Sequence, residues 1–185
     1  MKIPVILAVG AMAAGAASAR NIDIPVGTIL PVCTEGVSSS AVMFQAKGLA
    51  SKMFAPAGVT IEWRSWNGCP ADGIRISLSQ HSRLSDHPHA YAYALPFEGT
   101  HIVLFWDRIE AAAEPRAIRY LTAHVLVHEL THILQGTIRH SETGVMKAVF
   151  TQADIGEMEF RPLPFAPEDL ELIQSGLTIR QARQN

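Results

Sequence analysis

The stretch that decides the fold is Ile118 to Gly136, IRYLTAHVLVHELTHILQG. Its apolar residues fall on several faces of a helix, and this pattern is typical of a helix that is buried all round. We expect the helix to begin near Glu114-Pro115, because proline is favoured in a first helical turn. Gly136 is a suitable left-handed cap at the other end. The sequence therefore predicts a long core helix that ends at Gly136.

The last two turns of this predicted helix contain His128-Glu129-Leu130-Thr131-His132, an H-E-x-x-H pattern. Histidines four residues apart lie about 40° apart around a helix and roughly 6 Å apart along it. Both imidazoles therefore point to one side and can bind one metal ion. Glu129 lies beside that ion rather than on it, a position that suits a general base acting on a metal-bound water. We expect one Zn2+ ion with Glu129 as the catalytic residue.

A catalytic zinc usually has three protein ligands and one open position. His140 follows Gly136 by four residues, where the chain would return to the metal, and is our first choice for the third ligand. The alternative is a carboxylate further along the chain. Three such residues are within range: Asp154, Glu157 and Glu159. His124 precedes His128 by one turn, and we expect it to be a packed residue or to support a ligand, with a ligand role left open.

The segment His128 to Met146 resembles the metzincin clan of zinc metallopeptidases, whose pattern is H-E-x-x-H-x-x-G-x-x-H followed by a methionine turn. The spacing here is longer, H-E-x-x-H-x-x-x-G-x-x-x-H, and Gly144-Val145-Met146 is the candidate turn, with no tyrosine just after Met146. The resemblance implies a zinc-dependent peptidase. It also implies that the edge strand at 91–95 pairs with bound peptide.

The order of the other predicted elements agrees with that resemblance. Alternating or apolar runs predict strands within 22–32 and at 59–63, 74–78, 91–95 and 101–106. One-sided apolar spacing predicts helices at 41–54 and 167–183. We therefore expect an α+β, zincin-like fold. In it a mixed β-sheet packs on an N-terminal helix and on the long helix with H-E-x-x-H, followed by a small C-terminal helical part.

The first nineteen residues have the features of a secretory signal peptide. Lys2 is followed by an uncharged apolar run from Ile3 to Ala17, and Ala17-Ser18-Ala19 is an A-x-A cleavage signal. We expect a signal peptide at 1–19, a single domain at 20–185, and a secreted or periplasmic protein. The alternative is an uncleaved N-terminal anchor. No later segment is long and apolar enough to predict stable membrane insertion after signal removal.

Cysteine content and charge restrict the remaining possibilities. Cys33 and Cys69 are the two cysteines, and in an exported protein we expect them to form a disulfide rather than free thiols or a soft-metal site. The chain has 15 basic and 17 acidic residues, with a formal net charge of −2. Without a basic patch, nucleic acid is not an expected partner.

These observations lead to one functional hypothesis and two alternatives. The first is a secreted zinc-dependent peptidase that acts on peptide or protein substrates through a metal-activated water. The second is a non-catalytic zinc-binding module of an exported protein. The third is a zinc amidase that acts on cell-wall material. Hydrolysis assays with and without a chelator separate the three.

Overall fold

The computed structural model describes residues 27–35, 40–82 and 89–182. The predicted signal peptide at 1–19 and the start of the first predicted strand, up to residue 26, lie outside the described residues. The domain assignment for 20–185 therefore stays a prediction, and the fold described below is that of the three ranges.

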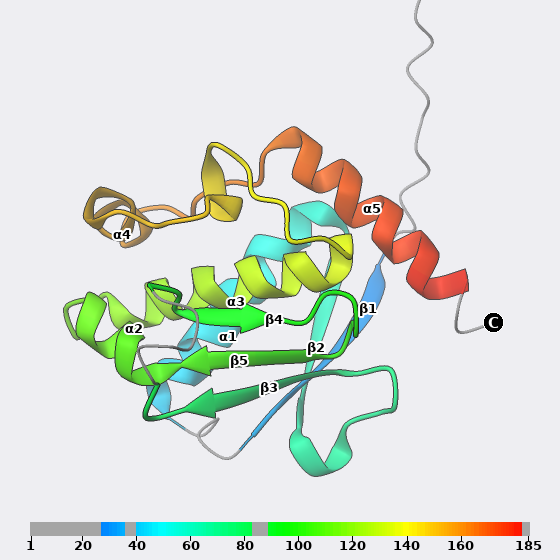
Figure 1. Ribbon diagram of the computed structural model, residues 1–185, viewed down its shortest axis with the longest axis horizontal. Coiled ribbons are helices and arrows are strands. Elements are labelled where there is room, and N and C mark those ends of the chain that lie inside the picture. The colour runs from blue at the N-terminus through cyan, green and yellow to red at the C-terminus, as the bar shows by residue number, and fades with distance from the viewer. Residues whose placement is uncertain (1–26, 36–39, 83–88, 183–185) are drawn as a thin grey trace, which may run out of the picture.

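A five-stranded mixed sheet forms the base of the domain (Figure 1). Its strands are β1 (Thr28–Thr34), β2 (Val59–Ser65), β3 (Ile74–Ser79), β4 (Ala92–Ala94) and β5 (His101–Phe105). The strand order is β2-β1-β3-β5-β4, with β4 antiparallel to β5 and every other pair parallel. The predicted mixed sheet is confirmed, and the short strand β4 is at its edge.

One face of the sheet forms the floor of the hydrophobic core. Leu30 pairs with Ile61, and Ile76 pairs with Ile102, and all four side chains are buried. On the opposite face the exposed side chains of Glu62 and Arg64 bond to each other. Because side chains alternate across a strand, this pattern means that the covering helices lie on one face only.

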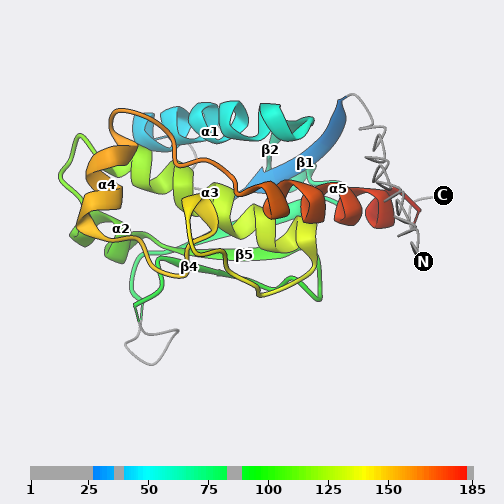
Figure 2. The same ribbon diagram turned by 90° about the horizontal axis from the view of Figure 1, so that it is seen from above.

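Two helices cover that face, α1 (Ala41–Phe54) and α3 (Ile118–Gln135), and they pack against each other (Figure 2). Helix α1 begins at Ser40, whose hydroxyl accepts a hydrogen bond from the backbone N–H of Met43 at 3.1 Å. Its buried side chains, spaced for one face, are Met43, Ala46, Ala50, Met53 and Phe54. Helix α3 is buried at every position from Leu121 to Leu134, as its apolar sequence predicts.

The smaller elements lie around this two-layer core. Helix α2 (Trp106–Ala112) follows β5 directly, and α4 (Gln152–Met158) and α5 (Pro167–Ala182) come after α3. Helices α4 and α5 lie at opposite ends of the domain (Figure 1). Single 3-10 turns are formed by Ala55–Ala57, Trp66–Gly68 and Gly144–Met146.

Several predicted boundaries need correction. The last strand ends at Phe105 because Trp106 already belongs to α2, a seven-residue helix that the sequence did not reveal. Helix α3 begins at Ile118 rather than near Glu114-Pro115, where a turn precedes it. Helix α4 was also missed, because seven residues are too few to produce a clear apolar period.

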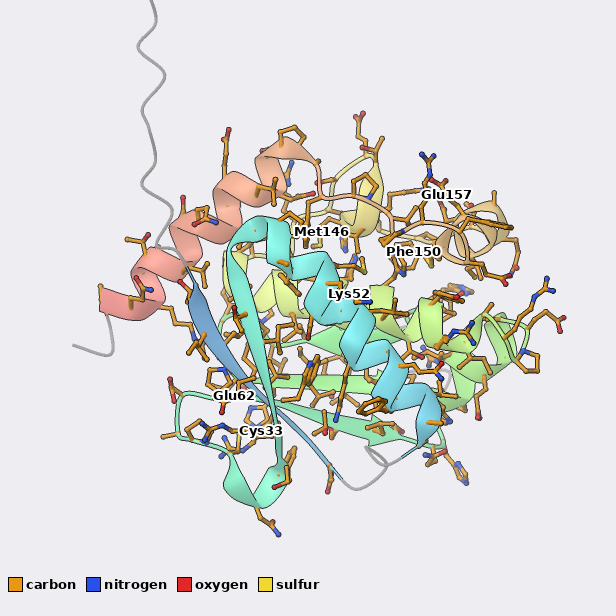
Figure 3. The ribbon with its side chains drawn as sticks, turned by 180° about the vertical axis from the view of Figure 1, so that it is seen from behind. Cys33, Lys52, Glu62, Met146, Phe150 and Glu157 are labelled. Atoms are coloured by element: carbon orange, nitrogen blue, oxygen red, sulfur yellow. A yellow bond between two sulfur atoms is a disulfide. The ribbon has the colours of Figure 1, made fainter. Side chains whose placement is uncertain are left out.

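The predicted disulfide is confirmed. Cys33 of β1 bonds to Cys69, with the two Cα atoms 5.6 Å apart (Figure 3). The bond ties the buried strand β1 to the segment that follows β2. Within the described ranges, no helix combines the length and the apolar character needed to span a bilayer.

Candidate metal centre

Helix α3 places two histidines side by side at its C-terminal end. The imidazole Nε2 atoms of His128 and His132 are 3.0 Å apart, and both side chains are buried. The helix ends directly after them at Gly136, which has φ 63° and donates its backbone N–H to the His132 carbonyl. The chain can therefore reverse within one turn of the second histidine.

Backbone carbonyls fix the orientation of both rings. His128 donates from Nδ1 to the carbonyl of Val145 at 2.9 Å, and His132 donates from Nδ1 to the carbonyl of Thr137 at 2.9 Å. With the proton on Nδ1, each Nε2 carries a lone pair, so the short contact between the two Nε2 atoms has no hydrogen in it. A cation bound by both Nε2 lone pairs would stabilise this close approach of the two rings.

His140 approaches the same point from the returning chain. Its ring centroid is 5.2 Å from that of His128 and 5.0 Å from that of His132. One nitrogen from each of the three rings lies within 4.8 Å of the other two. The structure thus brings together the three histidines that the sequence selected, with His140 the one exposed member.

The three rival carboxylates are engaged elsewhere. Asp154 caps α4 by bonding to Thr151 and pairs with Lys147, at 2.6 Å. Glu157, on α4 (Figure 3), pairs with Arg161. Glu159 pairs with Arg116. Among the described residues, the group of potential ligands contains the three histidines and no carboxylate.

His124 is packed rather than directed at the metal centre. Its Nδ1 donates to the Tyr120 carbonyl at 2.7 Å, and its Nε2 accepts from the backbone N–H of Leu163 at 3.0 Å. Burial lowers its pKa to about 4, against the raising effect of the Tyr120 carbonyl. Both ring nitrogens of His124 have hydrogen-bond partners, so this residue links the segment before α5 to α3.

Burial favours the neutral form of all three clustered imidazoles. Burial, and then the neighbouring His132, lower the pKa of His128 to about 4. Burial and His140 lower the pKa of His132 to about 4 as well, and burial lowers the pKa of His140. Metal ions bind the neutral form of imidazole, so no proton has to be displaced at neutral pH.

Glu129 is a buried carboxyl group beside the histidines. Burial raises its pKa to about 8, and a hydrogen bond from the backbone of Ala94 in β4 acts in the opposite direction. A divalent cation next to this carboxyl would favour the ionised form. The pKa of Glu129 therefore depends strongly on whether the histidines bind a cation.

The turn Gly144–Met146 follows the chain reversal and orients one of the three histidines. Met146 is fully buried in the core, its carbonyl accepts from the backbone N–H of Ser141 at 2.8 Å, and the preceding carbonyl orients His128. Gly144 has φ 76°, and a Cβ there would lie 2.1 Å from the Pro164 carbonyl oxygen. The turn therefore requires glycine at 144.

The three histidines and Glu129 line a cleft of about 440 Å³. Strand β4 with the residues before it forms one wall, and the segment 147–150 forms the other. Three apolar side chains also line the cleft. Those of Ile138 and Val149 are exposed, and the ring of Phe150 is largely buried.

Sequence reasoning missed the groups that orient the ligands. The carbonyls of Val145 and Thr137 have no side-chain signal, because any residue supplies a backbone oxygen. Asp169 and Ser141, which bond to each other beside His140, lie 28 residues apart in the chain. Helix α4, which the sequence analysis missed, did have a local signal: Thr151 and Asp154 have the spacing of a capping box at its start.

The donor set fits zinc. Two nitrogens bound about 2.0–2.1 Å from one tetrahedral zinc lie roughly 3.3 Å apart, close to the 3.0 Å between the two Nε2 atoms. Three neutral imidazoles with no carboxylate or thiolate are a ligand set that catalytic zinc uses. The chemistry of these side chains therefore matches the ion that the motif predicted.

Comparison with known proteins supports the fold. No protein-family model matches the chain, and no curated protein matches it. Among solved structures, the crystal structure of archaemetzincin from Methanopyrus kandleri is similar, with a TM-score of 0.56 and 15% sequence identity. The match covers 80% of this chain and 96% of that one. The mixed-sheet architecture of this chain is therefore similar to that of a solved structure.

Proposed function

We propose that this protein is a zinc-dependent peptidase whose metal ligands are His128, His132 and His140 and whose general base is Glu129. The observation that carries the proposal is the cluster of three imidazoles, with one nitrogen of each within 4.8 Å of the others, and a buried carboxyl group beside them. The archaemetzincin-like fold supports the same assignment.

Each residue has a defined part in the proposed reaction. Zinc bound by the three imidazoles would supply a water of lowered pKa and polarise the scissile carbonyl. Glu129 takes a proton from the attacking water and passes it to the leaving nitrogen. The Ala94 N–H holds the Glu129 carboxyl group against the strand on which the substrate lies. Met146 provides the packed base of the site.

Among the described residues β4 is the edge strand of the sheet, and its outer side is a candidate site for an extended peptide, with the outward Ala94 N–H already bonded to Glu129. The Tyr91 carbonyl and the Leu95 N–H bond to β5, so the backbone of Ala92 between them faces away from the sheet. A peptide can therefore add to β4 as a further strand, with backbone hydrogen bonds providing affinity. This arrangement favours a peptide or protein substrate over a small amide.

Export is part of the proposal. The signal-like sequence at 1–19 precedes a domain that contains the Cys33–Cys69 disulfide, and disulfides persist in oxidising compartments. We therefore place the protein outside the cytosol, secreted or periplasmic. Sequencing the N-terminus of protein recovered from the culture medium or periplasm tests this step, and a mature chain beginning at Arg20 is the expected result.

The central experiment combines a metal measurement with an activity assay. Purified mature protein should contain about one equivalent of zinc and should cleave members of a mixed peptide library, with activity lost to a chelator and restored by zinc. Zinc without cleavage of peptides or of cell-wall material would support a non-catalytic module. Cleavage of cell-wall material alone would support the amidase alternative. A protein that binds no zinc would refute the proposal.

A further inference from the structure

Asp169 is a fully buried carboxylate at the start of α5, remote in sequence from the three histidines. Its Oδ2 accepts the backbone N–H of Ala166 at 3.0 Å, which fixes it to its own helix start. Its Oδ1 faces the opposite way, toward the chain reversal after α3. There it accepts from the Ser141 hydroxyl at 2.6 Å and from Arg139 Nη1 at 3.3 Å.

The two donors to Oδ1 are the residues on either side of His140. This matters because His140 differs from the other two histidines. His128 and His132 lie on a helix and bond to backbone carbonyls, whereas the ring of His140 is exposed and has no hydrogen-bond partner within the described part of the chain. Its position must therefore be set through its neighbours.

The helix whose first turn contains Asp169 packs closely against α3. Gly176 of α5 packs so closely on the Leu134 carbonyl that a Cβ would lie 1.6 Å from that oxygen. Gln135 of α3 also donates from Nε2 to the Asp169 carbonyl, at 3.2 Å. Asp169 thus connects the loop that carries His140 to the helix that carries His128 and His132.

We propose that Asp169 is the positioning residue for His140, which it places through Ser141 and Arg139. This inference rests on the proposed zinc site. It also gives a reason for the long spacing between Gly136 and His140. A longer loop has more conformations, so a contact outside the loop is needed to hold its histidine in one place.

The test is the zinc affinity of the full mature chain, measured by competition with a chromophoric chelator. Asp169→Asn and Ser141→Ala should each weaken zinc binding by about 10–100-fold, the range found when hydrogen-bond partners of metal ligands are removed. Asp169→Asn should have the larger effect, because an amide has only one acceptor oxygen and must lose either the Ala166 N–H or the two donors beside His140, whereas Ser141→Ala loses a single hydrogen bond. Glu168→Gln is the matched control, since it also pairs with Arg139 but does not touch Ser141, and its affinity should stay close to that of the wild type.

A second measurement, amide hydrogen exchange of residues 137–141 in the metal-free protein, reports the loop directly. Exchange should be faster in Ser141→Ala and Asp169→Asn than in the wild type and Glu168→Gln. Unchanged zinc affinity and exchange in Ser141→Ala, a partly exposed residue whose loss the fold should tolerate, would overturn the inference and leave the peptidase proposal standing. A wild-type protein that takes up no zinc would overturn both.

Discussion

The imidazole of His128 and the carbonyl of Val145 are joined by a 2.9 Å hydrogen bond across 17 residues of chain. The Val145 N–H in turn donates to the Pro164 carbonyl at 2.9 Å. A ring on the core helix is therefore oriented by a turn, and the turn is itself held by the segment before α5. The orientation of His128 therefore depends on the chain that follows α3.

Glu129→Gln should abolish most of the hydrolytic activity without removing zinc. Glutamine keeps the shape of the side chain but cannot take a proton from water, and general base catalysis typically contributes about 10²–10⁴-fold to a rate. We expect kcat to fall by that factor on any peptide that the library assay identifies, with about one zinc per chain retained. Glu142→Gln, at an exposed position, is the control. Wild-type rates in the Glu129 variant would exclude it as the base.

His140→Ala should weaken zinc binding by more than about 100-fold. The loss should exceed the 10–100-fold that removal of a ligand's hydrogen-bond partner costs, because a direct bond to the metal is lost. Chelator competition measures the affinity, and His101→Ala provides a control at an exposed histidine on β5. If the His140 variant binds zinc as tightly as the wild type, the third ligand is another residue.

Glu129→Gln should also stabilise the metal-free protein at pH 8. The pKa of Glu129 is about 8 when folded against an ordinary 4.5, so between these values the folded state binds more protons than the unfolded state. Stability from this group is then complete below pH 4.5 and lost as the pH rises to 8. One pKa unit corresponds to about 1.4 kcal/mol, so the variant should gain a few kcal/mol at pH 8 and almost nothing at pH 4.5.

Urea unfolding in the presence of a chelator, from pH 4.5 to 8.5, measures this difference. His128 and His132 act in the opposite direction in both proteins, because their folded pKa values of about 4 lie below the ordinary 6.5. Their contribution is lost as the pH falls from 6.5 to 4, and it cancels when variant and wild type are compared at each pH. A difference that does not depend on pH would show that Glu129 is ionised in the metal-free protein.

Removal of the Cys33–Cys69 disulfide should lower the free energy of unfolding by about 4 kcal/mol. The two cysteines are 36 residues apart, and closing a loop of that length restricts the unfolded chain by roughly this amount. Urea unfolding of a Cys33→Ala/Cys69→Ala variant gives the value. A reductant should destabilise the wild type similarly and leave the double variant unaffected. A loss under 1 kcal/mol would mean that the bond adds little to the packing of β1.

Gly144→Ala should damage the metal centre far more than Gly136→Ala. Both glycines have positive φ, so both variants incur the left-handed backbone cost of about 1 kcal/mol. Only at 144 does a Cβ also meet a backbone oxygen, at 2.1 Å from Pro164, whereas nothing lies within 4 Å of a Cβ at 136. We expect Gly144→Ala to lose zinc affinity or to fail to fold. Equal behaviour of the two variants would show that the turn can move without affecting His128.

The sequence predicted much of the site because its signals are local. Histidines four residues apart on a helix share a face whatever surrounds them, and Gly136 marks the chain reversal by its own backbone preference. The disulfide followed from the presence of two cysteines in a chain with a signal-like start. The five strands followed from their alternation, although β1 extends to Thr34 rather than ending at 32.

Only the tertiary structure distinguishes His140 from the carboxylates, because it gathers this histidine with His128 and His132. Asp154, Glu157 and Glu159 were in range along the chain, and their ion pairs with Lys147, Arg161 and Arg116 depend on where α4 packs. The roles of Val145, Thr137 and Asp169 were likewise hidden, because a backbone carbonyl has no sequence signature and a buried carboxylate pairs with whatever folding brings to it. Local periodicity fixes which residues share a helix face, whereas long-range packing fixes which distant groups orient them.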